Sequence, residues 1–150
     1  MENINWTCKP FNTLTSFELY KILRLRSEVF VVEQNCAYLD EDNKDQPSWH
    51  FMGWTNDELI AYVRILPAGL AFNEVSIGRV VNSPTVRGQG VGRLLMENAI
   101  LKTREIFGKQ NIRIGAQLYL QKFYSSLGFE QVSDIYLEDN IQHIEMLLTK

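Results

Sequence analysis

The chain has 150 residues, of which 45% are hydrophobic and 22% are charged, which is the composition of an ordinary soluble globular protein. A chain of this length buries about 70% of its unfolded surface, so we expect a single domain over residues 1–150. The formal net charge of -3 argues against nucleic-acid binding, because a surface that follows phosphates needs an excess of Lys and Arg.

Neither a membrane segment nor a cysteine framework is expected. The longest apolar runs, such as LIAYVRIL at 59–66, are short and interrupted by charge. The start MENINWTCKP has no basic stretch followed by an apolar one, which predicts a cytoplasmic protein. Cys8 and Cys36 are too few and too scattered for a disulfide framework or a metal site, and we expect reduced thiols and no metal.

The first expected elements are a strand and a helix. INWTC at 4–8 alternates as a strand does, and Thr15 with Glu18 matches a capping box at a helix start. Apolar residues at helical spacing then follow, namely Leu19, Ile22, Leu23, Val29 and Phe30. The sequence therefore predicts a first helix that begins after Thr15.

A long acidic segment follows at 32–49 and contains DEDNKD at 40–45. Connections this long are usually functional or mobile. A calcium loop is excluded, because Lys44 occupies a ligand position and Phe51 stands where the bidentate acid is needed. The acids predict a solvated loop or, alternatively, a surface that recognises a cationic acceptor such as a polyamine or lysine side chain.

The rest of the chain predicts strands followed by alternating helices and strands. HFMGWT and LIAYVRIL flank a turn at Asn56 and Asp57, which predicts a hairpin, and VSIGRVVN predicts the next strand. Later elements are a helix up to Phe107, a strand IRIGAQ, a short helix in LQKFYSSL, and strands near Tyr136 and in IQHIEMLL. This order indicates an α/β or α+β domain with a mixed sheet.

The stretch VRGQGVGRLL places three glycines at alternate positions between the strand at 75–82 and a helix. Free N–H groups at such a helix start attract anions, and missing Cβ atoms let a phosphate approach. A dinucleotide fingerprint needs glycine where Arg93 stands, and the Gly-Lys-Ser/Thr of a triphosphate loop is absent. The pattern fits a pyrophosphate that is held but not cleaved, with a plain tight turn as the alternative.

Two motifs resemble those of the GNAT family of N-acetyltransferases. RGQGVG at 87–92 resembles the family signature Arg/Gln-x-x-Gly-x-Gly/Ala, and FYSSLGF at 123–129 resembles its second landmark, a helix with a tyrosine that ends in Leu-Gly-Phe. The element order matches the family over nearly the whole chain. Within it, RSEVFVVEQNCAYLDEDNKD, IGRV, AQLYLQKFYSSLGF and EDNIQHIEM are similar to the ElaA-type subgroup.

The resemblance implies a mixed, mostly antiparallel central sheet with helices on both faces, and acetyl-coenzyme A as the acyl donor. Val80 and Val81 would hydrogen-bond the pantetheine arm like an added strand, and one of their N–H groups would face the thioester carbonyl. The pyrophosphate would be wrapped by the backbone of the glycine loop, which comprises Arg87, Gly88, Gln89, Gly90, Val91, Gly92 and Arg93.

The resemblance also assigns the helix of the second landmark to the donor site. Tyr124 would lie where the sulfur departs and would donate a proton to the thiolate, while Phe123 belongs to the same carrier site. The alternative for Tyr124 is a half-buried aromatic residue on an amphipathic helix. No motif places Cys36 near the thioester, so direct attack without a covalent enzyme intermediate is expected.

The acceptor side has few candidate residues. An attacking amine must lose a proton, and Glu33, His50 and His143 are the candidate bases. The alternative for either histidine is a structural hydrogen-bonding role. Arg79, next to the carrier-binding strand, could orient an acidic group on the acceptor.

The sequence thus predicts an enzyme that moves an acetyl group from acetyl-coenzyme A to a primary amine on a small molecule or peptide. The alternative is a module that senses coenzyme A or an acyl derivative without catalysis. Dimers are frequent among similar proteins, so analogy allows a homodimer, but the sequence does not specify the oligomeric state.

Overall fold

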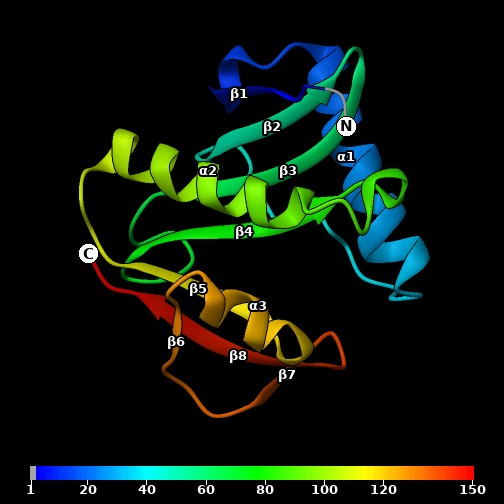
Figure 1. The fold of residues 1–150 in the computed structure, drawn as a ribbon. Coiled ribbons are helices and arrows are strands. Elements are labelled where there is room, and N and C mark those ends of the chain that lie inside the picture. Colours follow the sequence, from blue (N-terminus) through cyan, green and yellow to red (C-terminus); the bar gives the residue numbers. More distant parts are fainter. Residues whose placement is uncertain (1–2) are drawn as a thin grey trace.

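The computed structural model describes residues 3–150, which form one sheet with helices against it (Figure 1). The helices are α1 (Ser16–Arg26), which continues into a π-helical segment, η2 (Ser27–Glu33), α2 (Val91–Phe107) and α3 (Gln121–Ser126). The strands are β1 (Asn5–Pro10), β2 (Trp49–Thr55), β3 (Glu58–Leu66), β4 (Val75–Asn82), β5 (Ile112–Gln117), β6 (Glu130–Gln131), β7 (Tyr136–Glu138) and β8 (Ile141–Leu148). Short 3₁₀ turns lie at 11–13, 84–86 and 118–120.

The strand order is β1-β2-β3-β4-β5-β8-β6, and β7 also pairs with β8. All these neighbours are antiparallel except β4 and β5, which are parallel. A parallel pair needs a crossover connection, and α2 supplies it. The mixed, mostly antiparallel sheet that the resemblance implied is thereby confirmed.

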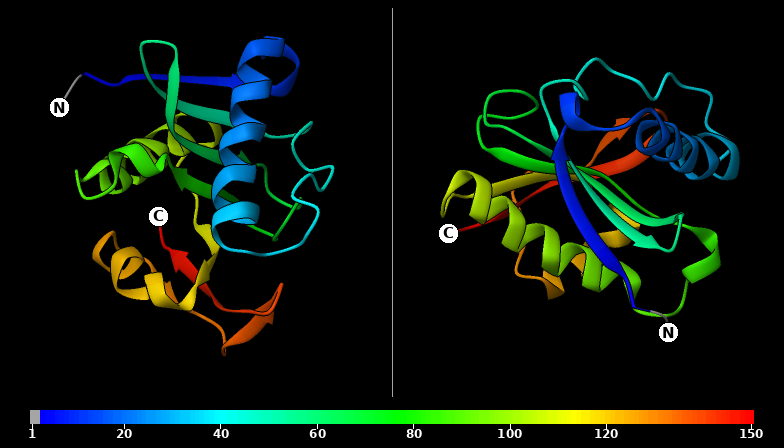
Figure 2. Two further views of the ribbon diagram at one scale, coloured as in Figure 1. Left: turned by 90° about the vertical axis from the view of Figure 1, so that its right-hand side faces the viewer. Right: turned by 90° about the horizontal axis from the view of Figure 1, so that it is seen from above.

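Helices cover both faces of the sheet, as expected (Figure 2). Successive strand side chains point to opposite faces, so Phe51 and Val63 join the core under α2, whereas Met52 and Tyr62 join the core under α1. None of the helices in the part of the chain that the structure describes is long and apolar enough to pass through a bilayer.

Local signals account for most element boundaries. The capping box is present, because the Glu18 N–H donates to Thr15 Oγ1 at 3.1 Å and the Thr15 N–H donates to Glu18 Oε1 at 2.8 Å. The hairpin turn is also present, with Asn56 in the left-handed region at φ 55°. The first strand begins and ends slightly later than expected, since pairing with β2 carries it to Pro10.

Candidate active site

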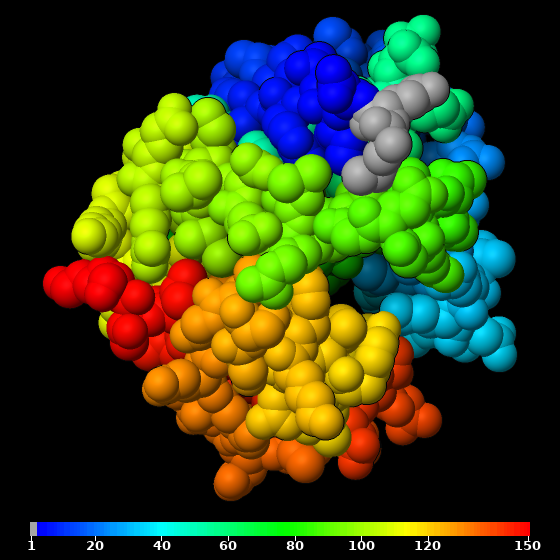
Figure 3. Space-filling model, viewed as in Figure 1, coloured from blue at the N-terminus to red at the C-terminus, as the bar shows by residue number. Residues whose placement is uncertain are grey.

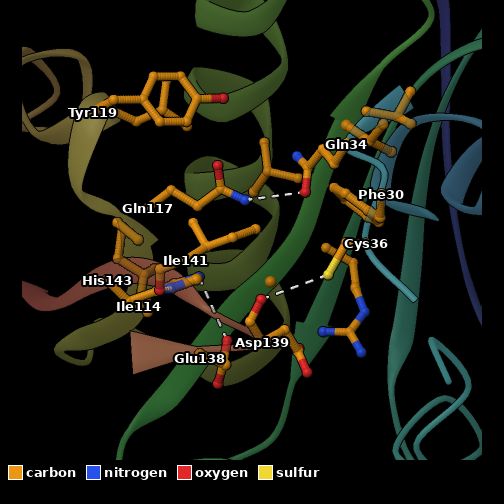
Figure 4. Close-up of a pocket in the computed structure, with 18 of the residues that line it drawn as sticks. Phe30, Gln34, Cys36, Ile114, Gln117, Tyr119, Glu138, Asp139, Ile141 and His143 are labelled. Atoms are coloured by element: carbon orange, nitrogen blue, oxygen red, sulfur yellow. Dashed lines mark hydrogen bonds and ion pairs between the residues drawn. The ribbon is translucent and has the colours of Figure 1, made fainter. Parts of the chain in front are cut away.

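The sheet separates between its two parallel strands. Across residues 3–150, β4 and β5 pair only at Val75 with Ile112 and at Ser76 with Arg113. Beyond these pairs the strands diverge, and a cavity of about 370 Å³ lies between them. Its walls come from β4 and β5, from η2 and the segment after it, and from the turn between β7 and β8 (Figure 4). The gap leaves backbone groups of β4 free to bond an extended ligand.

A β-bulge shapes the β4 wall. The register with β3 shifts between Tyr62 and Arg64, so that Arg79 and Val80 lie opposite a single residue. Arg79 has φ 50°, which is uncommon for a residue other than glycine. Val80 and Val81 line the cavity, so the bulge occurs in the part of β4 that the resemblance assigned to the pantetheine arm.

The glycine loop lies at the start of α2. Gly88 and Gly90 have φ 78° and 79°, and a Cβ at either position would meet no protein atom within 4 Å. Gly90 is the N-cap residue of α2, and neither a side-chain cap nor an acidic residue occupies the first turn. The first N–H groups of the helix are therefore available to an anion, and the open space beside the glycines fits a pyrophosphate.

Other residues of the loop hold it in place. Val91 is buried in the core, and a Cβ on Gly92 would lie 3.0 Å from Asn82 Nδ2 and 4.0 Å from Phe123 Cζ. Phe123 thus packs beneath the loop and does not line the cavity. Arg93 donates from Nη1 to Ser126 Oγ at 2.8 Å, which ties α2 to the α3 region beside it in the space-filling view (Figure 3).

Tyr124 lines the cavity from α3 and is only 5% exposed. Its ring packs edge-on against Phe123 and Phe129, with centroids 5.1 and 5.9 Å away. Burial raises the pKa of the Tyr124 phenol, so the hydroxyl remains protonated at neutral pH, as in any tyrosine, and can donate a hydrogen bond. The position is compatible with proton donation to a departing sulfur.

The three candidate bases occupy different environments, and two of them do not line the cavity. Glu33 is exposed and forms a two-fold ion pair with Arg87, whose hydrogen bonds lower the pKa of that carboxyl. His50 is fully buried, with Nδ1 2.7 Å from the Tyr62 hydroxyl and Nε2 2.9 Å from the Asp45 carbonyl. Burial lowers the pKa of His50, and its two hydrogen bonds correspond to the structural alternative.

His143 does line the cavity (Figure 4). Its Nδ1 lies 2.7 Å from the Ile141 carbonyl oxygen, which can only accept, so Nδ1 carries the proton. In the neutral form of the ring the lone pair is then on Nε2, which lies 3.5 Å from Glu138 Oε2. Tyr136 stacks on the imidazole with centroids 5.8 Å apart. Of the three candidates, His143 is the one whose side chain lines the cavity.

The acidic segment is not a solvated loop, and this expectation was wrong. Asp40 and Asp45 are buried, and the Arg26 guanidinium lies 2.7 Å from Asp40 Oδ2 and 2.8 Å from Asp45 Oδ1. Arg64 binds Asp42 and Asp45 at 2.7 and 2.8 Å. These acids are neutralised within the protein, so they are not free to bind a cationic acceptor either.

Arg79 completes this cluster. Its guanidinium pairs with Asp40 and Asp42, so it is not free to bind an acidic group on an acceptor. We call the six side chains the ion network, namely Arg26, Arg64, Arg79, Asp40, Asp42 and Asp45. Burial by itself would raise the pKa of Asp42 and Asp45, but hydrogen bonds from Arg64 and Arg26 outweigh it and lower both values.

Several cavity residues had no sequence signal. The Cys36 thiol lies 3.7 Å from the Asp139 carbonyl oxygen, and Gln117 donates to Gln34 at 3.5 Å across the cavity (Figure 4). The turn at Asp139 and Asn140 could have been predicted from its Asp-Asn pair, because these residue types favour the left-handed conformation that both adopt. Its place opposite Cys36 depends on the tertiary fold. No group of residues in 3–150 has the arrangement of a metal site.

The split sheet, the bulged β4 and the glycine loop before α2 together define the GNAT fold, the fold of acyl-CoA N-acyltransferases. The family model described as "Acetyltransferase (GNAT) domain" matches residues 19–150. This match shows that the chain belongs to the GNAT family. Its similarity to ElaA proteins places it in the ElaA-type subgroup.

Curated and solved relatives are similar over their full length. Protein ElaA of Escherichia coli is 43% identical over 145 residues, which cover 95% of each chain. The crystal structure of an acyl-CoA N-acyltransferase from Pseudomonas aeruginosa has a TM-score of 0.94 and 42% identity, covering 98% of this chain and 100% of that chain. The Escherichia coli ElaA crystal structure has a TM-score of 0.91 and 41% identity, covering 97% of this chain and 99% of that chain. Family membership supports acyl transfer in general.

Proposed function

We propose that the protein transfers an acetyl group from acetyl-coenzyme A to a primary amine. The observation that carries the proposal is that one cavity is bordered by the stretch of β4 whose β5 side has no strand partner, by Tyr124 and by Arg87, where the glycine loop begins. A carrier with a pyrophosphate and an amide-rich arm requires an anion site followed by a strand edge. This combination favours coenzyme A over NAD or ATP.

The chain's own residues can bind such a carrier in two places. N–H groups of Gly88 to Arg93 would bind the pyrophosphate at the start of α2, where the helix dipole favours negative charge. Backbone groups of Val80 and Val81 would bond the pantetheine amides along the β4 edge. Acetyl-coenzyme A supplies an activated acetyl thioester when bound.

Acyl transfer then needs three contributions from the protein. A β4 N–H near Val80 stabilises negative charge that develops on the acetyl carbonyl oxygen. His143 Nε2 accepts the proton that the attacking amine loses, and the nearby Glu138 carboxylate stabilises the imidazolium. The Tyr124 phenol donates a proton to the sulfur as the carbon–sulfur bond breaks. No atom of the protein becomes acetylated in this series of steps.

A thiol-release assay tests the proposal. The wild-type protein is incubated with acetyl-coenzyme A and a panel of amines, peptides and aminoglycosides, and free coenzyme A is measured. Turnover with any acceptor is the expected result, and Cys36→Ser should retain it because direct attack uses no thiol nucleophile. Tight binding of acetyl-coenzyme A without turnover across the panel would instead indicate a sensor.

A further inference from the structure

The ion network joins two walls of the cavity, and this inference about it rests on the proposed function. It holds three guanidinium groups and three carboxylates, so its formal charge is balanced. One wall is the segment after η2, where Cys36 and Tyr38 line the cavity. The other wall is the β4 bulge, where Arg79 and Val80 line it. Arg79 is the member of the network that connects them.

Arg79 is held at several points. Its Nε lies 2.8 Å from Asp40 Oδ1 as an ion pair, and its Nη2 donates to the Asp40 carbonyl oxygen at 2.9 Å. The same Nη2 lies 3.4 Å from Asp42 Oδ2. The guanidinium also lies over the Tyr38 ring, 5.9 Å from its centroid. Charge, a directed hydrogen bond and a cation–π contact therefore fix one side chain.

The groups that hold Arg79 are themselves held by rigid elements. Arg26 of α1 is fully buried and donates from Nε to Asp40 at 2.7 Å, and the Tyr38 hydroxyl donates to the same carboxylate at 2.7 Å. Arg64 of β3 makes a two-fold bond to Asp42 at 2.7 and 2.9 Å. The carboxylates that bind Arg79 are therefore held in place by α1, through Arg26, and by β3, through Arg64.

The backbone at Arg79 needs such an anchor. A residue other than glycine in the left-handed region is strained, and it persists only where its surroundings over-determine it. Buried ion pairs by themselves are weak evidence of a stabilising role, because apolar residues of similar volume often serve as well. The position of this strain, directly before Val80 in the cavity wall, points to a role at the site.

We propose that Arg79 and Asp40 are positioning residues, which hold the β4 bulge so that the backbone of Val80 and Val81 faces the acyl carrier. The ion pair fixes the left-handed turn at Arg79 and thereby the direction of the following N–H and C=O groups. It also fixes the distance between β4 and the Tyr38 segment. Asp40 and Arg79 act through the backbone of β4 and touch no reacting atom.

The test uses Arg79→Gly, because glycine adopts the left-handed conformation freely, so the side-chain anchor is lost without added backbone strain. The matched control is Asn56→Gly, which changes another left-handed residue, at φ 55° in the β2–β3 turn away from the cavity. Arg79→Lys restores a charge for Asp40. Tyr38→Phe removes a single hydrogen bond from Asp40 and loosens the anchor mildly. Each variant is measured for melting temperature, amide hydrogen exchange and acetyl-coenzyme A affinity.

Arg79→Gly is expected to stay folded while the β4 amides that bond to β3 beside the bulge exchange faster. Loss of preorganisation should weaken acetyl-coenzyme A binding about tenfold, with Arg79→Lys and Tyr38→Phe between Arg79→Gly and wild type. Asn56→Gly should match wild type in both measurements.

The positioning role would be overturned if both Arg79→Gly and Tyr38→Phe had wild-type exchange at the β4 amides bonded to β3 beside the bulge, or if both had wild-type affinity. A wild-type protein that fails to bind acetyl-coenzyme A would overturn the proposed function instead, and the exchange measurement would still decide whether the network holds the bulge.

Discussion

Two segments border the cavity, and they are built in opposite ways. In the segment at 34–48, the carboxylates of Asp40, Asp42 and Asp45 are matched by guanidinium groups and two of the three are buried. In the glycine loop at 87–92, Gly88 and Gly90 leave open space, and the first N–H groups of α2 have no side-chain cap.

The difference separates a segment that stabilises the fold from a segment that is available to bind a ligand. A segment whose buried carboxylates are paired internally contributes rigidity, so damage to it should appear in folding stability. A segment whose backbone donors are unused should contribute little to stability and much to ligand affinity. Variants in each segment, and at the residue proposed to act in chemistry, therefore have distinct expected signatures.

The greatest loss of turnover is expected at Tyr124, which belongs to neither segment. Tyr124→Phe keeps the ring packing against Phe129 and removes only the hydroxyl. Turnover should fall about 100- to 10,000-fold while acetyl-coenzyme A affinity changes little, because proton donation is gained in the transition state. Steady-state kinetics and calorimetry measure the two quantities.

Tyr119→Phe is the matched control for this variant, since Tyr119 also lines the cavity but is 75% exposed. It should retain turnover. If Tyr124→Phe turns over like wild type at saturating substrates, another group protonates the sulfur and Tyr124 is a packing residue.

The greatest loss of stability is expected in the ion network. Asp45→Asn removes the charge that faces both Arg26 and Arg64, so three guanidinium groups of the network face only two carboxylates. The free energy of unfolding should fall by about 3 kcal/mol, the low end of the range for a broken buried pair, because each cation keeps one carboxylate. Urea denaturation measures it, with Asp57→Asn in an exposed turn as the control. Equal urea midpoints for the two variants would show that the Asp45 charge contributes nothing to folding stability.

The glycine loop should show the opposite signature. In Gly90→Val the new side chain occupies the space proposed for the pyrophosphate, so acetyl-coenzyme A affinity should fall at least about tenfold, or about 1.4 kcal/mol. The left-handed backbone adds a stability cost of about 1–2 kcal/mol.

Gly69→Val measures that backbone cost separately. Gly69 has φ 86°, its Cβ would also meet nothing within 4 Å, and it does not line the cavity. Calorimetry should find normal affinity in Gly69→Val and reduced affinity in Gly90→Val. The same affinity in both variants would exclude the loop from carrier binding.

Acid should weaken the protein in two stages. The folded state lowers the pKa of His50, so below about pH 6.5 the unfolded chain binds the extra proton and stability falls as pH decreases. The folded state also lowers the pKa of Asp42 and Asp45, so their contribution is present above about pH 4 and is lost at lower pH. Melting temperatures between pH 8 and pH 3 check both stages. His50→Gln should remove the first stage, and a first stage of equal size in that variant would contradict its cause.

Sequence reasoning worked where the determinants are local. The capping box at Thr15, the turn at Asn56 and the glycine loop depend on backbone conformations and hydrogen bonds within a few residues, and all three have the expected form. The family resemblance supplied the mixed, mostly antiparallel character of the sheet. Tyr124 lines the cavity, and its role at the departing sulfur stays a prediction.

Sequence reasoning failed where the partner is distant. Asp40 and Asp45 pair with Arg26, which lies 14 and 19 residues away, and Asp40 pairs with Arg79, 39 residues away. Composition alone makes such a segment resemble a solvated loop. The contrast between His50 and His143 has the same origin, because both occur in strands and only tertiary packing encloses one and brings the other to the cavity.

The most direct measurement is thermal melting of the wild-type protein with acetyl-coenzyme A, NAD or ATP at equal concentrations. A ligand that binds only the folded state at 100 times its dissociation constant adds about 2.7 kcal/mol of stability. We predict that acetyl-coenzyme A raises the melting temperature and that NAD and ATP do not, because the glycine loop and the β4 edge together suit a pyrophosphate joined to an amide-rich arm. Equal shifts for the three ligands, or no shift with acetyl-coenzyme A, would contradict the proposal that the gap between β4 and β5 is an acyl-carrier site.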